Sequence, residues 1–275
     1  MLQTQTIDYF DGDTLLQGFL AFDDARSGPL PAVLIAHPWA GRNHFVMDKA
    51  RQLAELGYVG FALDMYGDAK LGVGADECSA LMMPLLEDRP KLQRRMLCAL
   101  DALRQQAPVD PARIAAMGFC FGGLCVLDLA RTGADLRGAV SFHGLLKPPG
   151  NTAVAAGADS GFTPRSPHTA TVVAAGADSG FTPRSPHTAT GQRIQAKVLV
   201  LHGHDDPMVP VEDVLALQEE LTQAGTDWQV HVYGNTVHAF TNPEANDPAY
   251  GTVYNATADS RSWQSLVNFL AEVLS

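Results

Sequence analysis

The sequence has few of the features that mark secreted or membrane proteins. Its 275 residues include only four cysteines, with no C-x-x-C pair and no histidine at the spacing of a zinc site. No window approaches the roughly 18 apolar residues that a membrane-spanning helix needs. The first residues lack the basic start and apolar stretch of a signal peptide. We therefore expect reduced thiols, no membrane association and a cytoplasmic location.

Positive charge is also scarce. The chain has 19 lysines and arginines against 30 aspartates and glutamates, a net charge of −11, and no cluster of basic residues. Such a charge repels nucleic acids and anionic lipid surfaces, which argues strongly against a nucleic-acid-binding protein. Apolar residues make up 46% of the chain and charged residues 18%, so a sizeable folded core is expected.

What is present is an alternation of apolar segments of strand length with longer helical patterns, which is typical of a parallel α/β sheet. The patterns predict one α/β domain over residues 1–275, with a mostly parallel sheet of eight strands flanked by helices. The expected strands are 6–10, 14–22, 32–36, 59–64, 113–120, 138–142, 197–202 and 228–233. The expected helices are 45–56, 89–106, 121–131, 211–224 and 262–274.

One segment departs from this alternation. Residues 154–171 recur letter for letter as residues 173–190, a period of 19. Two copies are too few for a repeat architecture, and their Gly, Pro, Ser and Thr content is typical of loops. We interpret 154–190 as a tandem-duplicated insertion that folding and catalysis do not need, with His168 and His187 as ordinary surface residues. The alternative is a lid beside the active site.

The most informative segment is Gly118-Phe119-Cys120-Phe121-Gly122, where a strand turns sharply into a helix. It matches the G-x-S-x-G nucleophile elbow with cysteine in place of serine. Glycines are needed there because side chains would collide across the tight turn, and the helix N-terminus favours a thiolate at Cys120. The alternative for Cys120 is a buried structural cysteine beside a glycine-rich turn.

Two later segments supply a candidate acid and a candidate base. The strand 197–202 ends in a turn that contains Asp205 and Asp206, of which Asp206 is the better candidate acid. The last strand is followed by His238 in a loop. Each residue alone has an ordinary structural explanation, as a turn aspartate or a surface histidine. The order nucleophile, acid, base, with each residue after a strand, is however that of the α/β-hydrolase fold.

With these motifs in place, the chain resembles the dienelactone hydrolase family of the α/β-hydrolase fold. The matching segments are Gly-Phe-Cys-Phe-Gly-Gly, Asp-Pro-Met-Val-Pro and His-Ala-Phe, together with the stretch 56–67, and the resemblance covers the chain except for 154–190. It implies Cys120 as nucleophile, Asp206 as acid and His238 as base in the hydrolysis of a small ester or lactone, without a cofactor. By analogy, the backbone N–H groups of Phe121 and Trp39 would form the oxyanion hole.

One position departs from the family pattern. Characterised dienelactone hydrolases carry a glutamate that takes the proton of the cysteine, and here Pro38 stands at the matching position. Activity on dienelactone itself is therefore in question. The arginines that hold a substrate carboxylate in the family have no secure match, and Arg42, Arg89 and Arg94 are the candidates. Phe240 is a further candidate for contact with the substrate, and Trp39, Phe119, Phe121 and Phe240 are expected to form an apolar pocket wall.

Other functions remain open at this point. The chain fits a general carboxylesterase or thioesterase, a catalytically silent binding protein of the same fold, or a redox role for Cys120. Four histidines, His37, His143, His202 and His204, follow strand ends, but they come from separate strands without helical pairing. We therefore expect no metal site. The expected partner is a small-molecule substrate, and the chain is expected to act as a monomer or homodimer.

Overall fold

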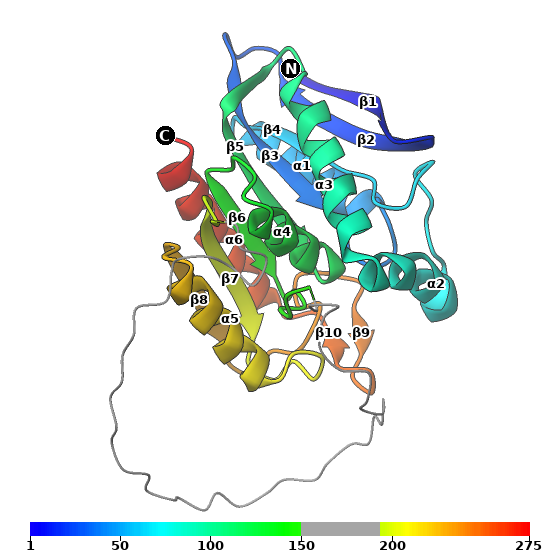
Figure 1. Cartoon of the computed structure of the whole chain (residues 1–275), viewed down its shortest axis with the longest axis vertical. Helices are drawn as coiled ribbons and strands as arrows, with labels where there is room; N and C mark the ends of the chain where they lie inside the picture. Colours follow the sequence, from blue (N-terminus) through cyan, green and yellow to red (C-terminus); the bar gives the residue numbers. More distant parts are fainter. Residues whose placement is uncertain (150–192) are drawn as a thin grey trace, which may run out of the picture.

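The computed structural model of the chain describes residues 1–149 and 193–275 (Figure 1). The duplicated segment 154–190, with His168 and His187, lies outside the described residues, so the expectations for it stay predictions. Within the described parts, no helix is both long and apolar enough to cross a membrane.

Eight strands form one sheet in the order β1-β2-β4-β3-β5-β6-β7-β8. Strand β1 pairs antiparallel with β2, and β2 with β4, whereas all other neighbours are parallel. The prediction of a mostly parallel eight-stranded sheet is confirmed. The strands are β1 (Leu2–Asp11), β2 (Thr14–Asp23), β3 (Leu30–Ala36), β4 (Val59–Ala62), β5 (Val109–Phe119), β6 (Gly138–Phe142), β7 (Lys197–Gly203) and β8 (Trp228–Tyr233).

Helices cover both faces of the sheet (Figure 1). Helices α1 (His44–Glu55) and α6 (Ala256–Val273) pack on one face. Helices α3 (Arg89–Arg104), α4 (Phe121–Arg131) and α5 (Val211–Gln223) pack on the other. Successive side chains of a strand point to opposite faces, so Ile35 of β3 packs among the first group and Leu34 among the second. Burial on both faces explains why the central strands are continuously apolar.

Three elements differ most from the sequence-based expectation. Helix α6 begins at Ala256 rather than at residue 262, because the Asn255 side chain caps it by accepting a hydrogen bond from the Ala258 N–H at 3.1 Å. Helix α2 (Gly74–Glu87) contains Pro84, which obscures its helical pattern. The third element is a short hairpin of β9 (Asn246–Asp247) and β10 (Thr252–Val253). Figure 1 shows this hairpin at the end of the molecule opposite the chain termini.

Candidate active site

Cys120 lies at the junction of β5 and α4 in a strained backbone conformation. Its φ of 54° falls in the left-handed region that residues with a side chain rarely adopt. Its N–H donates to the carbonyl of Phe142 at 3.0 Å. A side chain on Gly118 would overlap the carbonyl of Gly122, and one on Gly122 would overlap the carbonyl of Ala36. The predicted collision across the turn is therefore confirmed for Gly118, whereas glycine at 122 is required by the adjacent end of β3.

The structure brings Asp206, and not Asp205, to His238. The Nδ1 atom of His238 lies 2.7 Å from Oδ2 of Asp206, and both side chains are buried. The second carboxylate oxygen of Asp206 accepts from the Met208 N–H at 2.9 Å. Asp205 is exposed, and its N–H donates to the carbonyl of Thr236 at 2.9 Å. The carboxylate of Asp206 thus fixes the orientation of the imidazole.

The hairpin of β9 and β10 holds the backbone of His238. The His238 N–H donates to the carbonyl of Gly251 at 3.0 Å, and its carbonyl accepts from the Val253 N–H at 3.2 Å. Gly251 has a φ of 76°, and a side chain there would overlap Pro207 in the turn that carries Asp206. The hairpin therefore connects the loop of the histidine with the turn of the aspartate.

Cys120 and His238 perturb each other electrostatically. Burial alone would raise the pKa of Cys120, but the charge of His238 and two backbone N–H groups lower this pKa below its usual value. Burial alone would lower the pKa of His238, but the Cys120 thiolate and Asp206 raise it to about 10. Both shifts favour the charged forms, a Cys120 thiolate beside a His238 imidazolium.

The two N–H groups that act on the Cys120 sulfur belong to Phe121 and Trp39. Phe121 is the first residue of α4, and Trp39 lies in the loop after β3. The hydroxyl of Tyr66 donates to the carbonyl of Trp39 at 2.8 Å and braces this loop. The structure therefore places at the sulfur both residues that the sequence suggested for the oxyanion hole.

His37 braces the same loop and is a structural residue. Its Nε2 accepts from the Met65 N–H at 3.1 Å, so the proton is on Nδ1, which donates to the carbonyl of Pro38 at 2.7 Å. Burial lowers the pKa of His37, which keeps the ring neutral. This fixed tautomer ties the loop after β3 to the chain after β4.

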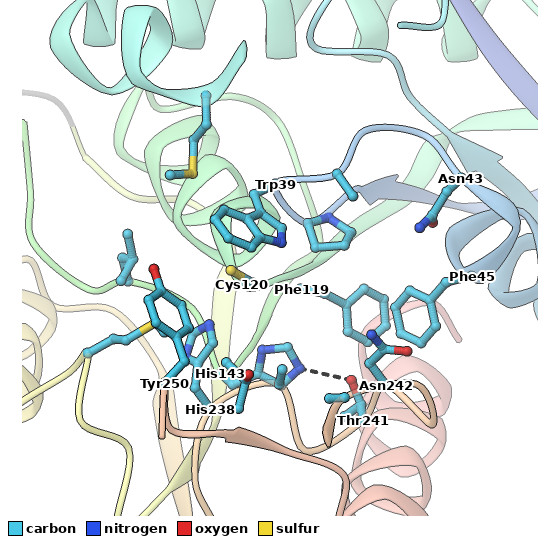
Figure 2. Close-up of a pocket in the computed structure, with 18 residues that line it drawn as sticks. Trp39, Asn43, Phe45, Phe119, Cys120, His143, His238, Thr241, Asn242 and Tyr250 are labelled. Carbon is cyan, nitrogen blue, oxygen red and sulfur yellow. Dashed lines mark hydrogen bonds between the residues drawn. The ribbon is translucent and has the colours of Figure 1, made fainter. Parts of the chain in front are cut away.

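A cavity of about 210 Å³ opens in front of Cys120 (Figure 2). Its walls come from the loops after β3, β5, β6, β7 and β8, from α2 and from the hairpin. Among the residues that the structure describes, no Lys, Arg, Asp or Glu lines it. Besides Cys120, His143 and His238, the lining residues are Pro38, Trp39, Ala40, Asn43, Phe45, Met82, Phe119, Leu145, Met208, Ala239, Thr241, Asn242, Ala245, Tyr250 and Thr252.

Four residues suggested for substrate binding do not reach this cavity. Arg89 is paired with the buried Asp128 at 2.6 Å, and Arg94 with Asp11 at 2.5 Å. Arg42 lies 3.5 Å from the sulfur of Met47. Phe240 is fully buried, and its ring packs against His143 with 5.0 Å between ring centroids. The structure corrects these expectations, because the partners of Arg89 and Arg94 hold them elsewhere and Phe240 belongs to the core.

Of the expected wall residues, Trp39 and Phe119 line the cavity. Phe121 does not line it, and only its backbone N–H group acts on Cys120. The four strand-end histidines do not assemble: within residues 1–149 and 193–275, no three His, Cys, Asp or Glu side chains form a cluster suited to a metal ion. His143 does line the cavity, and its Nε2 lies 2.8 Å from the hydroxyl of Thr241 (Figure 2). Burial and the charge of His238 lower the pKa of His143 far below its usual value, so its ring is neutral.

Comparison with known proteins decides the family. The model of the dienelactone hydrolase family matches residues 16–274. The chain belongs to the dienelactone hydrolase family. As a dienelactone hydrolase-like protein, it is a carboxylic ester hydrolase, and the expectation of this enzyme class is confirmed.

Relatives of known structure show the same architecture over the whole chain. A dienelactone hydrolase-like promiscuous phosphotriesterase from metagenomic libraries is 36% identical, with a TM-score of 0.82 over 100% of this chain and 99% of that one. An alpha/beta hydrolase enzyme from a deep-sea metagenome library is 17% identical, with a TM-score of 0.61 over 99% and 98% of the two chains. In a comparison of sequences alone, a putative carboxymethylenebutenolidase of Yersinia pestis is 26% identical over 94% of this chain and 84% of its own length. The fold is the α/β-hydrolase fold.

Proposed function

We propose that this dienelactone hydrolase-like protein cleaves a small ester or lactone through an acyl intermediate on Cys120, with His238 as proton carrier and Asp206 as its orienting acid. The observation that carries the proposal is the arrangement at the end of the sheet. Cys120 sits in a strained elbow under two backbone N–H groups, and it is coupled to an imidazole that Asp206 holds at 2.7 Å.

The first half-reaction acylates the sulfur. The Cys120 thiolate attacks the carbonyl carbon, and the electron pair of the C=O bond moves to the oxygen, which faces the N–H groups of Phe121 and Trp39. When the tetrahedral intermediate collapses, the bond to the alcohol oxygen breaks and the His238 imidazolium gives its proton to that oxygen. Each oxyanion donor typically contributes about 10²–10³ in rate.

The second half-reaction uses the same histidine as a base. The pKa of His238 is raised most by the negative charge of the Cys120 thiolate. Acylation removes that charge, so the pKa of His238 falls and the neutral ring can take a proton from water. The hydroxide attacks the thioester, the carboxylic acid leaves, and the thiolate–imidazolium pair forms again.

This scheme needs no glutamate next to the cysteine. In the family pattern such a glutamate removes the thiol proton, and here Pro38 lines the cavity instead. The lowered pKa of Cys120 supports a thiolate that exists before substrate binds, with His238 as its counter-ion.

A second candidate activity is the hydrolysis of neutral phosphotriesters. The relative that is 36% identical is described as a promiscuous phosphotriesterase. The observation that favours this activity here is the cavity lining, in which the described residues include no charged side chain apart from the Cys120–His238 pair. Such a lining accepts a neutral triester as readily as a neutral carboxylic ester.

The test is hydrolysis of phenyl acetate, a thioester, a lactone and a neutral phosphotriester by the wild type, Cys120→Ala and Cys98→Ala. We expect Cys120→Ala to lose at least about 10³-fold in kcat/KM, and mass spectrometry to detect an acyl group on Cys120 in the wild type. Cys98 is half-buried on α3 away from the cavity, so Cys98→Ala controls for removal of a thiol. Equal rates in the wild type and Cys120→Ala would rule out catalysis at this cysteine.

A further inference from the structure

Apart from the Cys120–His238 pair, which is neutral as a whole, no charged side chain among the described residues lines the cavity beside Cys120. Its other polar walls are neutral groups, among them Asn43, Thr241, Asn242 and the neutral ring of His143. Every arginine that the sequence suggested for binding a carboxylate lies outside the lining. A bound carboxylate would therefore find hydrogen-bond donors there but no positive partner.

The surroundings of the cavity are negative. Whether the shared proton is on Cys120 or on His238, that pair is neutral as a whole, and the buried Asp206 adds one negative charge. A neighbouring groove shares Phe45, Thr241 and Asn242 with the cavity. It carries the carboxylates of Asp48, Glu244 and Asp259 against the amine of Lys49 and the imidazole of His44, and Asp48 is also paired with Arg51 at 2.6 Å.

From these observations we infer that the enzyme selects uncharged esters and rejects substrates that carry a carboxylate, including carboxylated lactones. A carboxylate entering this cavity loses its water and gains no counter-ion, while the charge of Asp206 opposes it. The net charge of −11 also lowers the local concentration of anions around the protein. This inference rests on the proposed function, because the cavity is a substrate site only if Cys120 is the nucleophile.

The size and walls of the cavity indicate which neutral group fits. A volume of about 210 Å³ exceeds the roughly 150 Å³ that suffices for benzene in an engineered protein cavity. Trp39 and Tyr250 stack with 6.2 Å between ring centroids, and Phe45 meets Phe119 edge to face at 4.9 Å. Figure 2 shows these four rings around Cys120. The matching substrate carries an aromatic ring or an alkyl group of similar size.

A pair of substrates that differ in charge and by a single methyl group tests the inference. The esters are methyl 4-acetoxybenzoate and 4-acetoxybenzoate, which share the acetyl group and the aryl ring. After correction for their rates with free hydroxide, we expect kcat/KM to be at least about 100-fold higher for the neutral ester. Equal values would overturn the inference and leave the proposed function intact. If neither ester is cleaved and Cys120 is not acylated, the proposed function itself fails.

An introduced cation tests the cause of the selectivity. Met82 of α2 is half-buried, packs against the edge of the core and lines the cavity, so Met82→Arg places a positive charge there. We expect Met82→Arg to reduce the preference for the neutral ester at least about tenfold, while Met82→Gln, a neutral side chain of similar length, keeps the wild-type preference. A preference that is the same in Met82→Arg and Met82→Gln would contradict the electrostatic explanation.

Discussion

Cys120 and His238 share one acidic proton, and Asp206 influences where that proton resides. The carboxylate lies 2.7 Å from Nδ1 of the imidazole and stabilises its charged form. The imidazolium in turn lowers the pKa of Cys120, although burial of the sulfur acts in the opposite direction. In the proposed mechanism, the reactive state is therefore a property of three side chains from three separate loops.

At the residue scale, the pH dependence of Cys120 alkylation follows from these shifts. The rate with iodoacetamide should rise with the thiolate and level off at a lower pH than for an unperturbed cysteine. It should then stay constant until His238 loses its proton at about pH 10. In Asp206→Asn the imidazolium loses its carboxylate partner, so the midpoint of the pH profile of Cys120 alkylation should move to higher pH. Ester turnover should fall about 10²–10⁴-fold.

Asp205→Asn is the matched control for this experiment, because the adjacent carboxylate is exposed and only its backbone meets the loop of His238. It should keep both the alkylation midpoint and the turnover of the wild type. A larger loss in Asp205→Asn than in Asp206→Asn would reassign the acid by one position.

At the element scale, the sequence predicted those helices and strands that a local pattern of residues encodes. The buried strands, α4 and the elbow have local signals, so β6, β8 and α4 have their predicted bounds. The partners of the arginines have no local signal, because Arg89 and Asp128 are 39 residues apart and Arg94 and Asp11 are 83 apart. Only the folded chain shows that these cations are engaged away from the cavity.

The hairpin of β9 and β10 shows the same limit. Strands of two residues have no hydrophobic period, so Tyr250 and Thr252 could not be recognised as cavity residues. The glycine at position 251 was a local signal of a turn, and the φ of 76° at this position explains why glycine is favoured there. What the sequence could not show is that this turn packs against Pro207 and supports His238.

The contact between α4 and the end of β3 leads to a prediction at the same scale. A side chain on Gly122 would overlap the backbone carbonyl of Ala36, which cannot yield as a flexible side chain would. Gly122→Ala should lower the free energy of unfolding by about 1–3 kcal/mol and also reduce turnover, because it moves Phe121 away from Trp39. Chemical denaturation and ester hydrolysis measure the two effects.

Gly234→Ala is the control, since a side chain at Gly234 meets no atom within 4 Å. It should leave turnover unchanged and stability equal or slightly higher. If both variants unfold at the wild-type denaturant concentration, the close approach at Gly122 does not limit the packing of α4.

At the scale of the whole molecule, the described residues supply both faces of the core and the cavity walls. Two arginines hold the chain that follows β6. Arg131 of α4 donates to the carbonyl of Leu146 at 3.0 Å, and Arg89 of α3 donates to the carbonyl of Lys147 at 3.2 Å. On the other side, Ile194 and Ala196 are buried in the same core as α4 and α5. Described residues thus anchor both ends of the connection between β6 and β7.

Deleting residues 154–190 joins Ala153 to Gly191 and tests whether the duplicated segment contributes to this core. Loop-closure entropy grows only logarithmically with length, about 0.6 kcal/mol per doubling, so shortening the connection changes stability little. We expect Tm to stay within about 2–4 °C of the wild type and the turnover of phenyl acetate to be nearly unchanged. The measurements are thermal unfolding and hydrolysis of esters of increasing size. A collapse of Tm, or a sharp change in size preference, would mean that the segment packs on the core or on the site, and the interpretation as a dispensable insertion would be wrong.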